Sequence, residues 1–425
     1  MNATLNSFLV PREQWLAWKY LSITPRPSPQ EGGNAQNGPH FFFWARNAIY
    51  HALEALEVPR HSRALLPAYL CRAAAEPFAA YGLECDFYDL KRDCTPDFSV
   101  IDAKIRPETR VVLTAHYFGF PQKIEEFSDL CRRRNLLLFE DCAHVLRTEF
   151  RGKRLGTFGD ASVFSYRKFL PMFDGAELLL SKAEKGAWKL ESSRFGRQAS
   201  RFIGSLAVNN SSSLFAKVIR RGVETTKGNG GTNSAESAAT APVQQAVDNN
   251  STTFDPTLLN QPMSGPSRWV LRHSDVEAVI ERRRANFVFL QEKFRNATGI
   301  TPLFEELPIG VCPWVYPMFI DGIPNAHLLL REAGVPAVTW GGVRIENIRM
   351  VDFPGADFLY DNLIFLPVHQ NLTDGHLGLI ADAVKKAGVE TRSLEPQKIF
   401  LPVKRDAMNR KAERKSKRSW RRKTS

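Results

Sequence analysis

The sequence places an acidic pair and a lysine where a parallel α/β protein keeps its reactive groups. Glu140 and Asp141 close the apolar run "LLLFED", and Lys168 follows inside the apolar stretch "FSYRKFL". Apolar surroundings lower the pKa of a lysine, so its amine is free to attack an aldehyde and form a Schiff base. A carboxylate nearby pairs with a protonated ring nitrogen. The pattern therefore indicates pyridoxal phosphate chemistry, which needs both groups.

Spacing alone leaves other interpretations open. A strand-end aspartate is often a cap of the following turn, and a lone lysine is usually on a solvated face. The remaining polar residues near predicted strand ends have equally plain structural interpretations, as core or strand residues: Tyr69, His116, His144 and Ser165. Trp314 and Trp340 fit either the substrate side of a site or core packing.

The elements around these residues alternate between apolar runs and helical patterns. The apolar runs are continuous, which is typical of a parallel sheet covered on both faces, and chemistry in such sheets sits at the carboxyl ends of the strands. The predicted strands of this region are 63–70, 83–90, 110–119 and 136–141, and the predicted helices are 47–58, 73–82 and 123–135. Gly82 and Asn135 are the expected helix ends.

The predicted fold class is α/β, with a mainly parallel, doubly wound sheet as the large domain and a smaller C-terminal α+β domain. Ser274 is the expected N-cap of a long helix in the smaller domain. The domain boundaries follow from shifts in composition. They are an N-terminal arm or loop (1–40), a large cofactor-binding domain (41–206), a polar low-complexity insertion (207–262), a small domain (263–392) and a basic disordered tail (393–425).

Charge is concentrated at the C-terminus. The net charge of the chain is +12, but the segment 404–425 alone carries 11 basic and 2 acidic residues. Such a tail binds nucleic acid or an anionic membrane surface, or remains a solvated end without a specific partner. The six cysteines show no zinc-finger spacing and no CxxC pair, so free thiols and no metal site are expected. The start of the chain resembles no secretory signal, and a cytoplasmic location without a transmembrane segment is expected.

Several motifs occur in the order of a known family. "FEDCAH", "GTFGDASVFSYRK" and "DGAELLLS" resemble the DegT/DnrJ/StrS-type nucleotide-sugar aminotransferases, which are fold-type I pyridoxal phosphate enzymes. "WARNAIYHALEAL" is similar to the family's phosphate-binding segment, and "LLPAYLC" to the strand whose aromatic covers the cofactor ring. The resemblance covers about residues 40–390 apart from the insertion.

The resemblance assigns a role to each matching position. It implies that Lys168 is the Schiff-base lysine and proton shuttle, that Asp141 pairs with the pyridine nitrogen, and that His144 lies against the ring or its phenolic oxygen. It further implies that the phosphate is bound by Ser165, Arg46 and Asn47, and that Tyr69 stacks on the ring. The catalytic residues implied are Lys168, Asp141 and His144.

The implied function is transamination: an amino group passes, with glutamate as expected donor, to a nucleotide-linked keto-sugar for polysaccharide or glycoconjugate synthesis. A homodimer is expected by the same resemblance. Two alternatives stay open, a dehydratase acting on deoxysugars and a non-catalytic binding or scaffold protein that uses its basic tail. The known dehydratases carry histidine in place of the lysine, so the presence of Lys168 argues against the dehydratase alternative. Two departures from the family keep the non-catalytic alternative open: the shortened "FSYRK" and Ala176 in place of a glycine. A further departure is Ala45–Asn47 in place of Ser-Gly-Thr.

Overall fold

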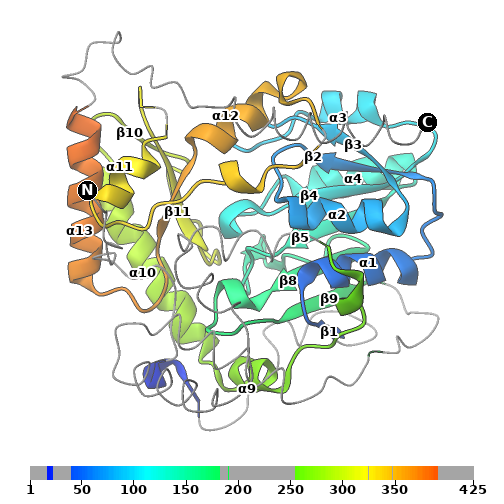
Figure 1. Ribbon diagram of the computed structural model, residues 1–425, viewed down its shortest axis with the longest axis horizontal. Helices are drawn as coiled ribbons and strands as arrows, with labels where there is room; N and C mark the ends of the chain where they lie inside the picture. Colours follow the sequence, from blue (N-terminus) through cyan, green and yellow to red (C-terminus); the bar gives the residue numbers. More distant parts are fainter. Residues whose placement is uncertain are drawn as a thin grey trace, which may run out of the picture.

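The computed structural model of the protein describes residues 17–22, 40–181, 190, 254–323, 325–346 and 348–390. Within them a seven-stranded sheet and a three-stranded sheet lie at opposite ends of the molecule (Figure 1). The basic tail, most of the N-terminal arm and residues 207–253 of the predicted insertion lie outside the described residues. Among the described helices, none has the length and apolar character needed to cross a membrane.

The large sheet is mainly parallel, as the sequence predicts. Its strand order is β1-β9-β8-β5-β4-β2-β3. The strands from β8 to β3 are parallel, and β9 is antiparallel to both of its neighbours, β8 and β1. The strands are β1 (His40–Phe42), β2 (Arg63–Pro67), β3 (Glu84–Tyr88), β4 (Thr109–Ala115), β5 (Leu137–Cys142), β8 (Ala161–Ser165) and β9 (Ala176–Leu180). A separate hairpin pairs β6 (Glu149–Phe150) with β7 (Lys153–Arg154).

Helices cover both faces of this sheet. Because crossovers between parallel strands are right-handed, the helix after β2 lies on one face and those after β3 and β4 lie on the other. The four helices are α1 (Ala45–Ala55), α2 (Arg72–Tyr81), α3 (Phe98–Lys104) and α4 (Ile124–Arg134). Gly82 and Asn135, both in the left-handed conformation, end α2 and α4 as predicted.

The second part of the chain builds an antiparallel sheet of β10 (Ile300–Pro302), β11 (Val315–Ile320) and β12 (Ile364–Pro367). Its helices are α9 (Gly265–His273), α10 (Val276–Phe294), α11 (His327–Glu332), α12 (Pro354–Asn362) and α13 (Asp374–Glu390). The predicted N-cap of α10 was wrong by one residue. Asp275 accepts the cap hydrogen bond from the Ala278 amide, whereas Ser274 donates its hydroxyl to the Val270 carbonyl at the end of α9.

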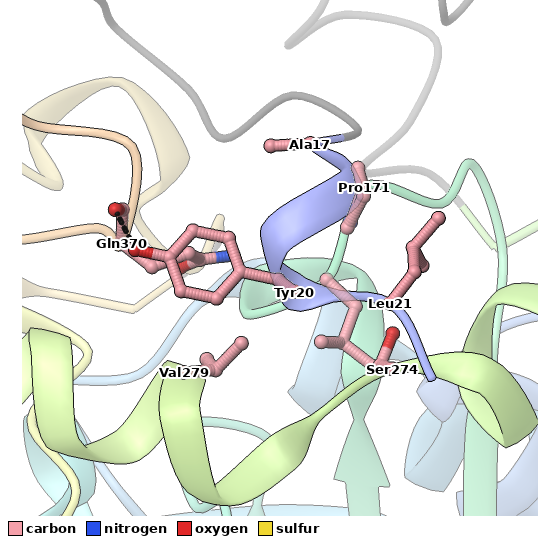
Figure 2. A pocket seen from close by; sticks show the side chains of 8 residues that line it. Ala17, Tyr20, Leu21, Pro171, Ser274, Val279 and Gln370 are labelled. Carbon is pink, nitrogen blue, oxygen red and sulfur yellow. Dashed lines mark hydrogen bonds between the residues drawn. The ribbon is translucent and has the colours of Figure 1, made fainter. Parts of the chain in front are cut away.

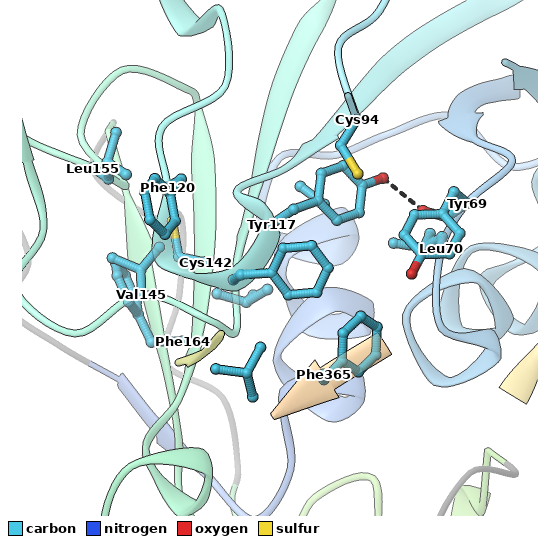
Figure 3. Packing of buried hydrophobic residues seen from close by; sticks show 14 of the residues in the cluster. Tyr69, Leu70, Cys94, Tyr117, Phe120, Cys142, Val145, Leu155, Phe164 and Phe365 are labelled. Carbon is cyan, nitrogen blue, oxygen red and sulfur yellow. Dashed lines mark hydrogen bonds between the residues drawn. The ribbon is translucent and has the colours of Figure 1, made fainter. Parts of the chain in front are cut away.

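One apolar core runs beneath both sheets. Aromatic rings join them: Phe118, after β4, lies with its centroid 4.9 Å from that of Phe365 on β12. Figure 3 shows part of this core around Phe365 and Tyr69, where the Tyr117 hydroxyl donates to the Tyr69 carbonyl at 2.6 Å. The loops that follow β2 and β4 are therefore fixed to each other and to the small sheet. All six cysteines are free thiols, and four of them lie in this core.

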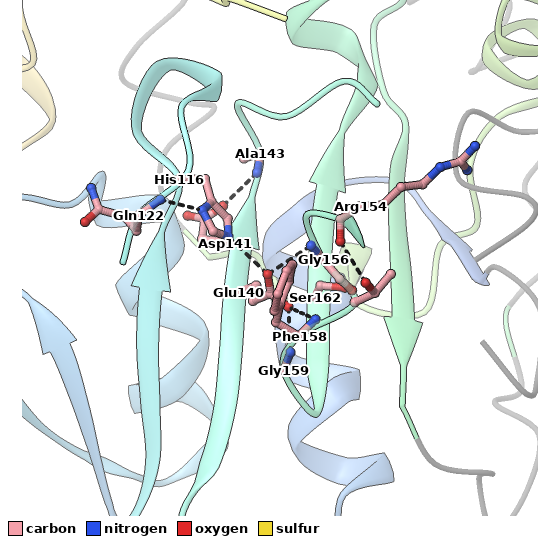
Figure 4. A network of polar contacts seen from close by, with 11 residues as sticks. His116, Gln122, Glu140, Asp141, Ala143, Arg154, Gly156, Phe158, Gly159 and Ser162 are labelled. Atoms are coloured by element: carbon pink, nitrogen blue, oxygen red, sulfur yellow. Dashed lines mark hydrogen bonds and ion pairs between the residues drawn. The ribbon is translucent and has the colours of Figure 1, made fainter. Parts of the chain in front are cut away.

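A buried carboxylate fixes the loop that leads into β8. Glu140 accepts hydrogen bonds from the amides of Gly156, Phe158 and Gly159 and from Nε2 of His116, at 2.6–3.0 Å (Figure 4). The Cys142 thiol lies beside this pair, and the three possible ligand atoms of His116, Glu140 and Cys142 are within 4.8 Å of one another. Because the two carboxylate oxygens already accept four hydrogen bonds, the network is explained as structural.

We predict that Glu140→Gln lowers the free energy of unfolding by about 3 kcal/mol, because the amide that replaces one carboxylate oxygen cannot accept the hydrogen bonds that buried backbone amides and His116 donate. Urea unfolding followed by circular dichroism measures the effect. The control is Glu126→Gln at an exposed position of α4, for which the free energy of unfolding should change by less than about 0.5 kcal/mol. Equal stability of the two variants would contradict the structural role of Glu140.

Candidate active site

Four strands of the large sheet end at one place. The chain leaves β2 toward Tyr69, β4 toward His116, β5 at Asp141 and β8 toward Lys168. Because these strands are parallel, their carboxyl ends share one edge of the sheet, where ligands of open α/β sheets bind. Side chains on a strand alternate between faces, so Glu140 enters the structural network while Asp141 faces the other way.

Lys168 closes the 3-10 turn η3 (Tyr166–Lys168) that follows β8. Its side chain is partly buried, and burial lowers the pKa of Lys168 to about 8, with a further lowering by Arg167. Asp141 and Cys71 oppose this shift of the pKa. A larger fraction of this lysine than of an ordinary one is therefore an uncharged, nucleophilic amine near neutral pH.

Asp141 is the carboxylate that interacts electrostatically with Lys168 and raises its pKa. Its Oδ1 accepts a hydrogen bond from the Ala143 amide at 2.9 Å, and its carbonyl accepts one from the His116 amide at 3.1 Å. Burial raises the pKa of Asp141, whereas the Lys168 charge lowers it. A carboxylate held by the backbone at a strand end is a fixed partner for a cation in the site.

His144 is buried beside both groups and is neutral, because burial and the Lys168 charge hold its pKa well below the usual value. Its Nδ1 accepts a hydrogen bond from the Phe118 amide at 3.3 Å, which places the ring proton on Nε2. Phe118 has a φ of 60°, a conformation that a non-glycine residue rarely adopts. Nε2 has no hydrogen-bond partner among the described residues.

Two tryptophans from the second part of the chain enter the site. The Trp314 indole stacks on His144 with centroids 4.0 Å apart, and Nζ of Lys168 lies 5.0 Å from the indole centroid. The Trp340 ring lies 5.3 Å from His144 and 5.0 Å from Tyr69. The sequence left the role of both tryptophans open, and the structure places them against the predicted site.

Tyr69 is fully buried, with its ring against Trp340 and Tyr360. Burial raises its pKa well above the ordinary value, and its hydroxyl has no hydrogen-bond partner in the described part of the chain. Two orphaned buried polar atoms, this hydroxyl and Nε2 of His144, therefore belong to one aromatic enclosure. Such atoms need a partner to offset the cost of burial, so both are candidate hydrogen-bonding groups for a polar ligand.

Positive charge gathers at the start of α1. Arg46 is buried over the Trp44 ring, and both burial and the neighbouring Arg167 lower its pKa, to about 10. Ser165, also buried, precedes the η3 turn. The Asn47 side chain donates to the Leu258 and Leu259 carbonyls, so it holds that segment against α1. Basic side chains around a helix start suit an anion such as phosphate.

The shortened "FSYRK" segment has a specific support. The Tyr166 hydroxyl donates to the buried Glu177 carboxylate on β9, and the Tyr166 amide donates to the Gly175 carbonyl at 3.0 Å. Ala176 is fully buried and pairs with Ser165 in the sheet. The unusual Ala176-Glu177 pair therefore belongs to the support of the η3 turn.

Comparison with known proteins concerns the same part of the chain. Residues 45–189 match the DegT/DnrJ/EryC1/StrS aminotransferase family. This segment of the chain is therefore similar to that family. The matched range contains α1 and the ends of β2, β4, β5 and β8. It therefore includes all seven residues to which the resemblance assigned a role.

Individual relatives match over a similar region. GDP-perosamine synthase of Escherichia coli O157:H7 is 32% identical over 121 residues, 28% of this chain and 33% of the relative. A dTDP-4-dehydro-2,3,6-trideoxy-D-glucose 4-aminotransferase of Saccharopolyspora spinosa is 31% identical over 131 residues, 30% of this chain and 34% of the relative. The matches thus span about a third of the length of these relatives. The similarity in fold covers more of the chain than the similarity in sequence. The PLP form of the sugar aminotransferase Spr1654 from Streptococcus pneumoniae aligns with a TM-score of 0.61 at 15% identity, over 88% of this chain and 93% of that one.

Sequence reasoning missed three contributors to the site. Cys71 starts α2 and is an electrostatic neighbour of Lys168, although "LLPAYLC" drew attention only to its tyrosine. Arg167 precedes the lysine directly and lowers its pKa. Arg283 contacts the site from α10, and in the sequence it is one of three consecutive arginines that look alike.

We predict that Asp141→Asn lowers the pKa of Lys168 below 8, because the carboxylate now raises it. A shift on the order of 1 unit is expected for removal of a close opposite charge. Trace acetylation of the lysine with acetic anhydride at a series of pH values, read by mass spectrometry of its peptide, gives the midpoint. Asp129→Asn on α4 is the control and leaves the midpoint unchanged; the same result for Asp141→Asn would contradict the pairing.

Proposed function

We propose that the protein is a pyridoxal phosphate-dependent aminotransferase that transfers an amino group to a nucleotide-linked keto-sugar. The observation that carries the proposal is Lys168, a partly buried amine with a pKa of about 8 beside Asp141 and His144 at the carboxyl edge of the sheet. The neighbours of the lysine distinguish it from a surface lysine. Part of the amine is unprotonated near neutral pH, and the carboxylate accepts a hydrogen bond from the Ala143 amide.

The residues present fit pyridoxal phosphate. Lys168 would hold its aldehyde carbon, Asp141 its ring nitrogen, and the Nε2 proton of His144 or the Tyr69 hydroxyl a ring oxygen. Arg46 and Ser165, with the first amides of α1, would hold the phosphate, and Asn47 would support the same helix start. The cofactor supplies an electron sink for the carbanion formed at the substrate carbon. Nζ of Lys168 takes a proton from the substrate carbon and returns it, since a pKa of about 8 lets the amine both accept and donate a proton near neutral pH.

The substrate class is supported by the names of the relatives, which include a GDP-sugar and a dTDP-4-dehydro-sugar enzyme. We therefore propose a nucleotide-linked keto-sugar as acceptor, with glutamate as donor, in polysaccharide or glycoconjugate synthesis. A homodimer in the cytoplasm is part of the same proposal. The domains that we propose are those predicted from the sequence. Residues 254–262, the end of the predicted insertion, contact α1 and β1.

The test is covalent attachment of pyridoxal phosphate. We expect the purified chain to show an absorbance band near the visible edge that glutamate shifts and that Lys168→Ala abolishes. Reduction with borohydride should then leave the cofactor mass on the Lys168 peptide. The control is Lys91→Ala, an exposed lysine whose loss leaves the band intact.

Each outcome separates the proposal from its alternatives. A band with no response to glutamate would favour other chemistry on the same cofactor. No band in the wild type would favour the non-catalytic binding or scaffold protein. A band that survives Lys168→Ala would overturn the assignment of the lysine.

The basic tail is proposed to bind nucleic acid or an anionic membrane surface independently of the active site. Removal of residues 404–425, which carry 11 basic residues, is expected to abolish binding to vesicles with anionic lipid or to DNA and to leave turnover unchanged. Binding by the full chain should weaken steeply with salt. A large loss of turnover on truncation would contradict this independence.

A further inference from the structure

Arg283 on α10 sends a buried guanidinium toward the backbone of the site. The side chain is 1% exposed. Its Nη1 donates to the Trp314 carbonyl at 3.0 Å, and its Nη2 lies 3.5 Å from the carbonyls of both Lys168 and Phe169. Its Nε donates to Oε1 of Gln370 at 3.0 Å. One planar group thus contacts the turn that carries the lysine and the residue whose ring lies against that lysine.

Gln370 completes the frame from the other side. Its Nε2 donates to the Phe169 carbonyl at 2.9 Å, so this one carbonyl is approached by two fixed side chains. The Arg283 guanidinium also lies 4.9 Å from the centroid of the Phe169 ring. Figure 2 shows how the N-terminal segment supports this place: the Tyr20 hydroxyl donates to the Gln370 carbonyl at 2.6 Å.

The opposite end of the frame is also fixed. The Trp314 amide donates to the Phe118 carbonyl at 2.8 Å, and the Phe118 amide donates to His144. The next residue is Gly119, where a Cβ would lie 2.2 Å from the Cys312 carbonyl, so only glycine allows this approach. Both the amide and the carbonyl of Trp314 are therefore hydrogen-bonded, which fixes the backbone that carries the indole.

The buried guanidinium of Arg283 has no carboxylate partner among the described residues, which makes its burial energetically costly. The contacts of Arg283 within the described residues are to carbonyl and amide oxygens, with no carboxylate among them. Burying a guanidinium without a counter-charge is expensive unless its donors are satisfied, and a planar five-donor fork can satisfy several backbone oxygens at fixed angles. The fold accepts that cost at the place where the lysine turn and the tryptophan meet.

We propose that Arg283 is a positioning residue for Lys168: with Gln370 it holds the lysine turn and Trp314 in one frame, so that the ammonium stays against the indole and beside Asp141. The inference rests on the proposed function for its role in catalysis, but the positioning itself concerns the chain alone. Without the frame, the η3 turn relaxes toward solvent, where Arg167 is already exposed. The amine then becomes hydrated and regains the titration of an ordinary lysine.

The experiment compares Arg283→Lys with Arg284→Lys. The first variant keeps the charge on α10 but loses the planar fork. The second is the matched control, since Arg284 is the adjacent residue and donates to the Pro308 and Val311 carbonyls instead. The readout is the pH midpoint of trace acetylation of Lys168 by acetic anhydride, with the exposed Lys91 as internal reference.

We expect a midpoint near 8 in the wild type and in Arg284→Lys, and a rise toward ~10.4, the value of a free lysine, in Arg283→Lys. Gln370→Met, which keeps the volume and removes both side-chain hydrogen bonds, should move the midpoint in the same direction by less. If Arg283→Lys does not fold, Gln370→Met is the test. A fall in melting temperature with an unchanged midpoint would show a purely structural role and overturn the proposal.

Borohydride reduction after addition of pyridoxal phosphate separates this inference from the proposed function. If the wild type shows no cofactor adduct on Lys168 but the midpoint still moves in Arg283→Lys, the function fails and the positioning stands. If the wild type forms the adduct, Arg283→Lys should need several-fold more pyridoxal phosphate for the same adduct at pH 7.5, while Arg284→Lys should not. Equal adduct formation and equal midpoints in the two variants would overturn the positioning.

Discussion

The site depends on keeping one ammonium group partly out of water while a carboxylate stays close to it. Burial lowers the pKa of Lys168, and Asp141 raises it, so the value of about 8 is a balance between desolvation and attraction. A fully solvated lysine would remain protonated at neutral pH and could not attack. A more deeply buried lysine without its carboxylate would lose the charge that fixes it.

Two separate networks maintain that balance. The Glu140 network holds the loop before β8 through three backbone amides and His116, and it lies on the opposite side of β5 from Asp141. The Arg283 frame holds the turn after β8 and the backbone of Trp314. Together they fix both ends of the strand that delivers the lysine. Each uses a buried charge whose donors or acceptors are satisfied mainly by backbone groups, which makes its position insensitive to neighbouring side chains.

The departures from the family pattern belong to the same support. The short "FSYRK" segment leaves little chain between Ser165 and Lys168, and the Tyr166–Glu177 hydrogen bond fixes the resulting turn to β9. Ala176 is fully buried in the sheet, away from solvent. The indole of Trp314 also lies directly on His144, so a flat ring is already part of this site. These features therefore fix the η3 turn that carries Lys168.

The sequence by itself determined the mainly parallel sheet, the ends of α2 and α4 at Gly82 and Asn135, and the proximity of Asp141 to Lys168. Continuous apolar runs and left-handed cap residues are local signals, and carboxyl ends of parallel strands must share an edge. Only the tertiary structure decided that Trp314, Arg283 and Gln370 reach the lysine, because these contacts join segments more than a hundred residues from it and leave no periodic pattern. It also decided that Asp275 rather than Ser274 caps α10, since both residue types cap well and only the backbone geometry distinguishes them.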